Sequence, residues 1–209
     1  MKTMDINCTL CNTPLLDKFG DYYKCSICMA MVKHTSLYPN AEDEKQRYLA
    51  HVNDVNDIRF QNFTAPITNY IIDHYSTSHL GLDFGCGTGP VITKVLKDLN
   101  YNVRKYDPYF AYYPGNLKYR YDFIAACEVV EHFYNPHKEF QSLFNLLKPQ
   151  GSLVMMTLLY QDNFDFDTWY YRKDPTHVII YRKETFEYIC NQYGFRDLKI
   201  VDRLIVLRK

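Results

Sequence analysis

The sequence predicts an α/β protein built on a doubly wound, mostly parallel sheet, with a small N-terminal unit held together by four cysteines. Three observations favour this fold class. From residue 80 onward, short apolar segments alternate with segments whose apolar residues recur at helical spacing, which is typical of a parallel sheet with helices on both faces. A glycine-rich turn joins the first strand segment to the first helical one, and two Cys-x-x-Cys pairs precede the whole pattern.

The composition is that of an ordinary globular chain. Of its 209 residues, 47% are hydrophobic, and 24 basic residues balance 24 acidic ones. This apolar content suits one main domain with a small appendage, and the neutral balance supplies no general attraction to nucleic acid. The sequence shows neither the apolar run of a signal peptide nor the ~20 apolar residues of a membrane span. We therefore expect a cytoplasmic protein with no membrane partner.

The N-terminal unit contains two Cys-x-x-Cys pairs, formed by Cys8, Cys11, Cys25 and Cys28. A segment of hairpin length separates the pairs, so the four thiolates can surround one zinc ion tetrahedrally. Four protein ligands leave no open position on the metal, and we expect this zinc to be structural. Two disulfides are the alternative, which the lack of a secretion signal disfavours. The prediction is a zinc ribbon over residues 1–40.

Residues 41–78 carry two helical patterns and are expected to form a helical cap or linker. The main domain then spans residues 79–209. Its expected strands are residues 80–84, 102–106, 123–126, 152–158, 199–201 and 204–207, and its expected helices are residues 91–99, 136–147 and 183–193. Ligands of such sheets bind at the carboxyl ends of the strands. The residues that follow each strand are therefore the candidates for function.

The first strand runs into a glycine-rich turn, with the order Asp83, Phe84, Gly85, Cys86, Gly87, Thr88 and Gly89. Such glycines let the chain turn sharply while the backbone comes close to a ligand. The order lacks the extra residues of a dinucleotide fingerprint, and a carboxylate precedes the glycines. The segment resembles motif I of the class I S-adenosylmethionine-dependent methyltransferases. This resemblance implies a Rossmann-like methyltransferase fold and S-adenosylmethionine as the cofactor.

The resemblance also implies a set of cofactor-binding residues. They are Asp83, Phe84, Gly85, Cys86, Gly87, Gly89, Asp107, Pro108, Cys127 and Glu128. Asp107 ends the second strand about 20 residues beyond the glycines, where a carboxylate can accept hydrogen bonds from both ribose hydroxyls. The alternative is a turn aspartate, because Asp-Pro is common in turns. Only residues 109–121 separate Asp107 from the next strand, whereas the family usually has another helix and strand there.

A polar cluster follows the third strand and contains Glu128, Glu131 and His132. If a helix begins near Glu128, the i, i+3 and i+4 spacing points all three side chains toward the cofactor crevice. The run E-x-x-E-H resembles motif IV of the ubiquinone-pathway O-methyltransferases and the small-RNA 2′-O-methyltransferases, where it can bind a divalent metal with help from a downstream histidine. His177 is the candidate for that histidine. Two carboxylates and two imidazoles suit magnesium, manganese or iron.

We therefore expect Glu131, His132 and His177 to be the catalytic residues. A metal at this site would lower the pKa of a substrate hydroxyl, and without a metal either histidine could act as the general base. The alternative is that the acid and the histidines only cap helices or orient loops. Substrate choice is expected to depend on the aromatic insert at residues 160–181, which either forms a lid or packs onto the sheet.

The expected function is S-adenosylmethionine-dependent methyl transfer to a small-molecule or protein acceptor, with O-methylation assisted by magnesium or manganese as the more specific form. A zinc ribbon ahead of such a domain also occurs in some ribosomal-RNA methyltransferases, so RNA is the second candidate substrate. The ribbon segment has four lysines against three aspartates, too little charge for strong phosphate binding. A noncatalytic cofactor-binding adaptor is the remaining alternative.

Overall fold

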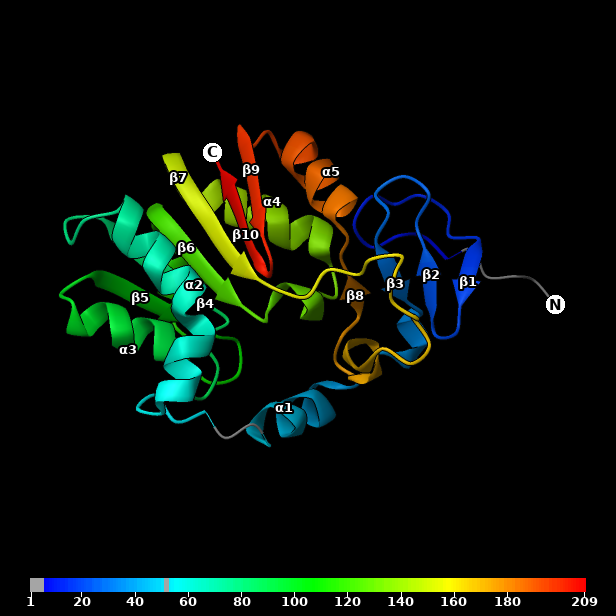
Figure 1. Ribbon diagram of the computed structural model, residues 1–209, viewed down its shortest axis with the longest axis horizontal. Helices are drawn as coiled ribbons and strands as arrows, with labels where there is room; N and C mark the ends of the chain where they lie inside the picture. Colours follow the sequence, from blue (N-terminus) through cyan, green and yellow to red (C-terminus); the bar gives the residue numbers. More distant parts are fainter. Residues whose placement is uncertain (1–5, 51–52) are drawn as a thin grey trace.

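The computed structural model describes residues 6–50 and 53–209, which form two β-sheets (Figure 1). The larger sheet has the strand order β5-β4-β6-β7-β10-β9, and the smaller one has the order β1-β2-β3-β8. Four short 3-10 helices connect the main elements: η1 (Thr35–Leu37), η2 (Pro114–Lys118), η3 (Val130–His132) and η4 (Tyr170–Lys173). Within the described ranges, no helix is both long and apolar enough to cross a membrane.

The larger sheet forms the core of the main domain. Its strands are β4 (Leu80–Phe84), β5 (Asn102–Tyr106), β6 (Tyr121–Cys127), β7 (Leu147–Met156), β9 (Asp197–Val201) and β10 (Leu204–Arg208). Strands β5, β4, β6 and β7 are parallel, and β10 pairs antiparallel with both β7 and β9. The prediction of a mostly parallel sheet is confirmed. Between β5 and β6 only η2 forms, so the sheet ends at β5 on that side.

Helices cover both faces of this sheet (Figure 1). They are α2 (Ile58–His74) and α3 (Val91–Asp98) on one face, and α4 (Pro136–Leu146) and α5 (Lys183–Tyr193) on the other. Successive strand residues point to opposite faces. In β6, Phe123 and Ala125 therefore pack with α2 and α3, whereas Ile124 and Ala126 pack with α4 and α5. Burial on both faces explains why the strand is apolar throughout.

The two helical patterns expected in residues 41–78 are α1 (Ala41–Leu49) and α2. Each begins at a residue whose side chain caps the first turn. The side-chain oxygen of Asn40 accepts hydrogen bonds from the backbone N–H groups of Glu42 and Asp43, and Asp57 does the same for Arg59. Such caps satisfy backbone donors that have no partner within the helix.

The smaller sheet joins the cysteine segment to the C-terminal half of the chain. Its strands are β1 (Asp17–Phe19), β2 (Tyr22–Lys24), β3 (Met31–Lys33) and β8 (Ile179–Ile180). Met31 pairs with Ile180 and Val32 with Ile179, in antiparallel register. The sequence predicted neither β3 nor β8. The division into segments 1–40, 41–78 and 79–209 stays a prediction, and residues 1–5, 51 and 52 lie outside the described residues.

The aromatic insert packs mainly against this smaller sheet. Phe166 forms one buried cluster with Tyr22, Met31 and Ile180, and Tyr160 and Trp169 pack around it. Of the two outcomes expected for the insert, packing of the rings is therefore the one observed for most of them. The surface that receives them is the cysteine segment rather than the large sheet.

Candidate active site

A cavity of about 1090 Å³ opens beside the carboxyl ends of β4, β5 and β6. Its glycine-loop wall is made by residues 83–89, 106–110 and 127–129. Its histidine wall is made by residues 44, 47, 48, 132–134, 170, 171 and 173–177. The residues expected to bind the cofactor all lie on the first wall: Asp83, Phe84, Gly85, Cys86, Gly87, Gly89, Asp107, Pro108, Cys127 and Glu128. Among the expected catalytic residues, His132 and His177 line the cavity, whereas Glu131 is fully buried next to it.

The glycine loop leaves no room for side chains at two of its positions. Gly85 has φ +71°, in the left-handed region that favours glycine, and its N–H donates to the carbonyl of Tyr106 at 2.8 Å. A β-carbon at Gly89 would lie 2.0 Å from the carbonyl oxygen of Asn53. Asn53, which lies between α1 and α2, is therefore placed directly against the loop.

Asp83 fixes the angle between β4 and α3. Its carboxylate is buried and accepts hydrogen bonds from the hydroxyl of Thr93 at 2.7 Å and from its backbone N–H at 3.1 Å. Burial raises the pKa of Asp83 to about 6, although the bonds from Thr93 oppose this shift. The carboxylate that precedes the glycines thus supports the loop from behind, in addition to reaching the cavity wall.

Asp107 connects the glycine loop to the turn after β5. One carboxylate oxygen accepts a hydrogen bond from the N–H of Gly87 at 2.9 Å, and the other accepts from the N–H groups of Tyr109 and Phe110 at 2.8 and 3.0 Å. This is the turn role that was the alternative for Asp107. A carboxylate oxygen can accept more than one hydrogen bond, so the side chain keeps acceptor capacity toward the cavity that it lines.

The expected helical turn beginning at Glu128 is wrong. Glu128 has φ +52°, which breaks a right-handed helix, and its N–H bonds to the carbonyl of Met156 in the neighbouring strand at 2.9 Å. Its carboxylate pairs with Arg203 at 2.8 Å. The pKa of Glu128 is raised, mainly because its carboxyl group is buried. Only the short helix η3 follows, so Glu128 does not share a helical face with Glu131 and His132.

Glu131, His132 and His177 nevertheless come together, with one donor atom of each within 4.8 Å of the others. The first carboxylate oxygen of Glu131 accepts a hydrogen bond from the hydroxyl of Tyr171. Its second oxygen is buried and has no hydrogen-bond partner in the described part of the chain. Burial raises the pKa of Glu131 to about 7. The residue thus has one oxygen held in place and one available to a ligand.

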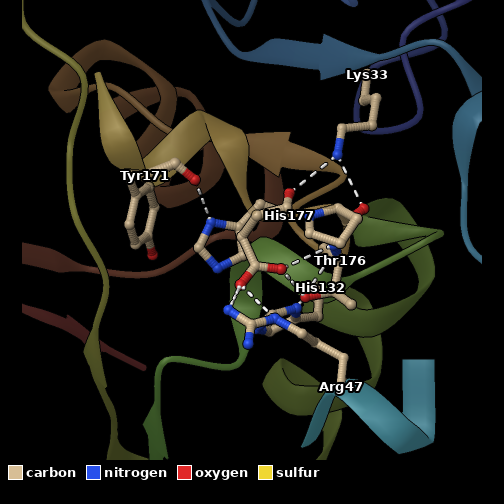
Figure 2. A network of polar contacts seen from close by, with 8 residues as sticks. Lys33, Arg47, His132, Tyr171, Thr176 and His177 are labelled. Carbon is tan, nitrogen blue, oxygen red and sulfur yellow. Dashed lines mark hydrogen bonds and ion pairs between the residues drawn. The ribbon is translucent and has the colours of Figure 1, made fainter. Parts of the chain in front are cut away.

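Carbonyl groups hold both histidine rings (Figure 2). Nδ1 of His132 lies 3.0 Å from the carbonyl oxygen of Thr176, and Nδ1 of His177 lies 2.7 Å from that of Tyr171. A carbonyl only accepts hydrogen bonds, so each Nδ1 carries the proton and each Nε2 keeps its lone pair when the ring is neutral. Burial lowers the pKa of both histidines, that of His177 to about 3. Both rings therefore offer a free Nε2.

The four N-terminal cysteines form a second group of possible metal ligands, again within 4.8 Å of one another. Sγ of Cys8 lies 3.5 Å from that of Cys28, and Sγ of Cys11 lies 3.3 Å from that of Cys25. These distances are far longer than the ~2.05 Å of a disulfide bond. All seven cysteines of the chain are free, so the disulfide alternative is not observed.

Comparison with known proteins identifies the family. A family model described as a methyltransferase domain matches residues 59–200. The chain belongs to this family. The match confirms the expected enzyme class, a class I S-adenosylmethionine-dependent methyltransferase. It begins after α1, so the cysteine segment lies outside the matched residues. No curated protein matches the chain in sequence.

Solved methyltransferase structures share the fold at low identity. An O-methyltransferase family protein from Burkholderia thailandensis is 13% identical with a TM-score of 0.53, over 79% of this chain and 61% of that protein. A SAM-dependent methyltransferase from Archaeoglobus fulgidus is 15% identical with a TM-score of 0.54, over 71% and 94%. Human N-acetylserotonin methyltransferase, solved in complex with SAM, is 14% identical with a TM-score of 0.53, over 84% and 58%. The chain thus spans less than two thirds of two of these proteins.

Several side chains of the methyltransferase site were not expected from the sequence. Glu44 in α1 accepts hydrogen bonds from the hydroxyls of Tyr48 and Tyr109, both at 2.7 Å. The ring of Tyr48 stands edge-on to His132, with the ring centres 5.3 Å apart. The i, i+4 spacing of Glu44 and Tyr48 was the available signal. Arg203, the partner of Glu128, lies in the hairpin between the last two strands, and no local pattern distinguishes it.

Proposed function

We propose that this methyltransferase transfers the methyl group of S-adenosylmethionine to a hydroxyl group of a small-molecule or protein acceptor, assisted by a divalent metal at Glu131, His132 and His177. The observation that carries the proposal is the convergence of three donor atoms beside the cavity. The likeness of the E-x-x-E-H run to the ubiquinone-pathway O-methyltransferases supports the choice of a hydroxyl acceptor.

The donor set fits a divalent metal. The free oxygen of Glu131 is buried without a partner, a costly state for a carboxylate that a cation would relieve. Each histidine is fixed through Nδ1 by a carbonyl, as is usual for metal-bound imidazoles. Two imidazoles and one carboxylate suit manganese, iron or magnesium and leave positions for further ligands. A bound metal would lower the pKa of an acceptor hydroxyl.

The other residues of the site act by positioning the methyl donor and the acceptor. We propose that the glycine loop, with Asp107 and Pro108 at its side, holds the methyl donor on one wall. The histidine wall, with Tyr48 and Glu44, then holds the acceptor facing it. Methyl transfer needs the acceptor oxygen in line with the methyl group and water excluded. In a form without divalent metal, Nε2 of His132 would accept the acceptor proton, because burial lowers the pKa of His177 to about 3 and makes it a weak base.

We also propose that Cys8, Cys11, Cys25 and Cys28 bind a structural zinc ion. Four cysteine sulfurs within a few ångströms of one another suit tetrahedral zinc. The segment around them is small, and such units depend on the metal for their folding. Zinc thiolates persist in a reducing compartment, which accords with a cytoplasmic protein.

The test combines metal removal with one conservative variant. Zinc-loaded protein freed of other divalent metals is titrated with S-adenosylmethionine by calorimetry, and its turnover on a panel of hydroxyl acceptors is measured with and without Mg²⁺ or Mn²⁺. We expect turnover to require the added metal. We expect Glu131→Gln to lower turnover about 10- to 100-fold, while the Kd for S-adenosylmethionine stays within twofold of wild type.

Glu139→Gln is the matched control, because Glu139 also lines the cavity but lies in α4, outside the cluster. Full turnover by Glu131→Gln, or by zinc-loaded protein without any other divalent metal, would contradict the metal-assisted mechanism. Binding of S-adenosylmethionine without turnover on any acceptor would favour the adaptor alternative instead.

A further inference from the structure

The turn that carries His177 is held from the cysteine segment. Nζ of Lys33, in β3, donates hydrogen bonds to the carbonyl oxygens of Asp174 at 3.1 Å and of Pro175 at 2.9 Å. Figure 2 shows the Lys33 side chain reaching down onto this turn. The backbone N–H of Lys33 also donates to the carbonyl of Val178 at 2.9 Å. One residue of the ribbon thus holds three carbonyls of the turn.

Tyr22 of β2 holds a fourth carbonyl. Its side chain is fully buried, and its hydroxyl donates to the carbonyl oxygen of His177 at 2.6 Å. Among residues 174–178, only the carbonyl of Thr176 is not bonded from the ribbon, and it accepts the bond from Nδ1 of His132. The ribbon therefore fixes the carbonyls on either side of the one that orients His132.

The opposite side of the turn is fixed as well. Arg47 of α1 forms two hydrogen bonds with one carboxylate oxygen of Asp174, at 2.7 and 3.1 Å. The other oxygen accepts from the N–H and the hydroxyl of Thr176. These bonds hold the start of the turn, but they do not reach the carbonyl of His177 or that of Val178. The N–H of His177 donates to the carbonyl of Asp174 at 3.2 Å and that of Val178 to the carbonyl of Glu131 at 2.9 Å. Tyr22 and Lys33 therefore hold the carbonyl side of this backbone.

We propose that Lys33 and Tyr22 are positioning residues of the methyltransferase site, so that the cysteine ribbon sets the orientation of His132 and His177. The part that these two rings play in methyl transfer rests on the proposed function. The contacts that orient the rings do not depend on it. Lys33 is only 5% exposed, and burying an ammonium group is costly. A methionine would fill the same space without that cost, so what the lysine adds is its hydrogen bonds to the turn.

The test uses two variants that keep the packing, Lys33→Met and Tyr22→Phe. The first readout is long-range ¹H–¹⁵N correlation of the histidine rings in zinc-loaded protein without other metals, which reports the tautomer of each ring. We expect wild-type His132 and His177 to carry the proton on Nδ1. In both variants we expect mixed tautomers or exchange broadening for these two rings, with unchanged zinc content.

The second readout is Mn²⁺ affinity, measured by electron paramagnetic resonance. We expect about a tenfold or greater loss in Lys33→Met and a smaller loss in Tyr22→Phe, with the Kd for S-adenosylmethionine within twofold of wild type. The matched controls are Lys18→Met and Tyr23→Phe. Lys18 is exposed in β1, and the Tyr23 hydroxyl has no hydrogen bond to any described residue. Both controls should behave as wild type.

The two proposals fail separately. Unchanged tautomers of both rings in Lys33→Met and Tyr22→Phe would overturn the positioning role, whatever the activity. Wild-type protein that binds no Mn²⁺ would overturn the metal proposal, and the ring tautomers would still decide whether the ribbon orients the histidines. Should Lys33→Met lose zinc or unfold, Tyr22→Phe alone carries the decision, because it removes a single hydroxyl.

Discussion

The glycine-loop wall and the histidine wall face the same cavity but are assembled over different distances in the sequence. The bond that joins the glycine loop to Asp107 links residues 20 positions apart, whereas the bond from Tyr22 to His177 spans 155 positions. The first wall follows the carboxyl ends of three adjacent strands of one sheet, β5, β4 and β6. The second needs β3 and β8 to meet, and each of them comes from a different half of the chain. We therefore expect damage to the ribbon to disturb the positions of His132 and His177 more than the binding of S-adenosylmethionine.

The largest expected effect comes from breaking the cysteine cluster. In Cys28→Ser only three thiolates remain, and we expect zinc loss, unfolding of the ribbon and a fall in turnover of at least about 100-fold. The Kd for S-adenosylmethionine should change by no more than a few-fold, because the glycine-loop wall has no residue from the ribbon. Elemental analysis, calorimetry and turnover measure the three quantities.

Cys190→Ser is the control for this variant, since Cys190 is a buried cysteine of α5 outside the cluster. Equal loss of cofactor affinity and turnover in Cys28→Ser would show that the two walls are not independent.

The converse variant acts on the glycine-loop wall. In Gly89→Ala the new β-carbon would lie 2.0 Å from the carbonyl oxygen of Asn53, so the loop or Asn53 must move. Overpacking of this kind costs about 1–3 kcal/mol, and we expect calorimetry to show S-adenosylmethionine bound about tenfold more weakly. Zinc content and the histidine tautomers should not change. Gly115→Ala is the control, because a β-carbon there meets no atom within 4 Å; similar effects of both variants would contradict the argument.

The same contrast explains how much the sequence alone could predict. The bounds of β4, β5 and α5 are as expected, because local apolar periodicity and the glycine turn determine them. The cysteine cluster was also found from spacing alone. By contrast, β3 and β8 have only three and two residues and depend on pairing with other strands, β3 with β2 and β8 with β3, so no local pattern indicates them. The helical-face argument failed at Glu128 because a left-handed residue there separates it from Glu131 and His132.

A smaller effect is expected from Asp107→Asn. The carboxylate now accepts hydrogen bonds from three backbone N–H groups. In the amide, an NH₂ group would replace one of the accepting oxygens and would face at least one of these donors. Loss of charge-assisted bonds and a local clash of donors should weaken S-adenosylmethionine binding about tenfold. Asp98→Asn, at an exposed position of α3, is the control. An unchanged Kd in Asp107→Asn would refute the assignment of Asp107 to the cofactor.

The smallest effect concerns stability and pH at Asp83. Burial raises the pKa of this carboxyl to about 6 in the folded protein, above its value in the unfolded chain. The folded state therefore binds the proton more tightly, and ionisation costs stability as the pH rises from about 4 through 6. Asp83→Asn removes that cost. The free energy of unfolding of the variant minus that of wild type should therefore increase by about 1–3 kcal/mol as the pH rises through this window, and stay constant at higher pH. Denaturant unfolding at several pH values measures this difference, and a flat difference would show that Asp83 is not buried as an acid.

The pairing of β8 with β3 also has a consequence for synthesis. The ribosome completes β3 almost 150 residues before it reaches Ile179 and Ile180, a delay of about ten seconds or more at usual rates. During that time the apolar edge formed by Met31 and Val32 is unpaired, and such edges promote aggregation. The same edge would be open in a ribbon produced without the rest of the chain. The intact chain contains β8, which pairs with this edge, whereas a trimmed ribbon does not.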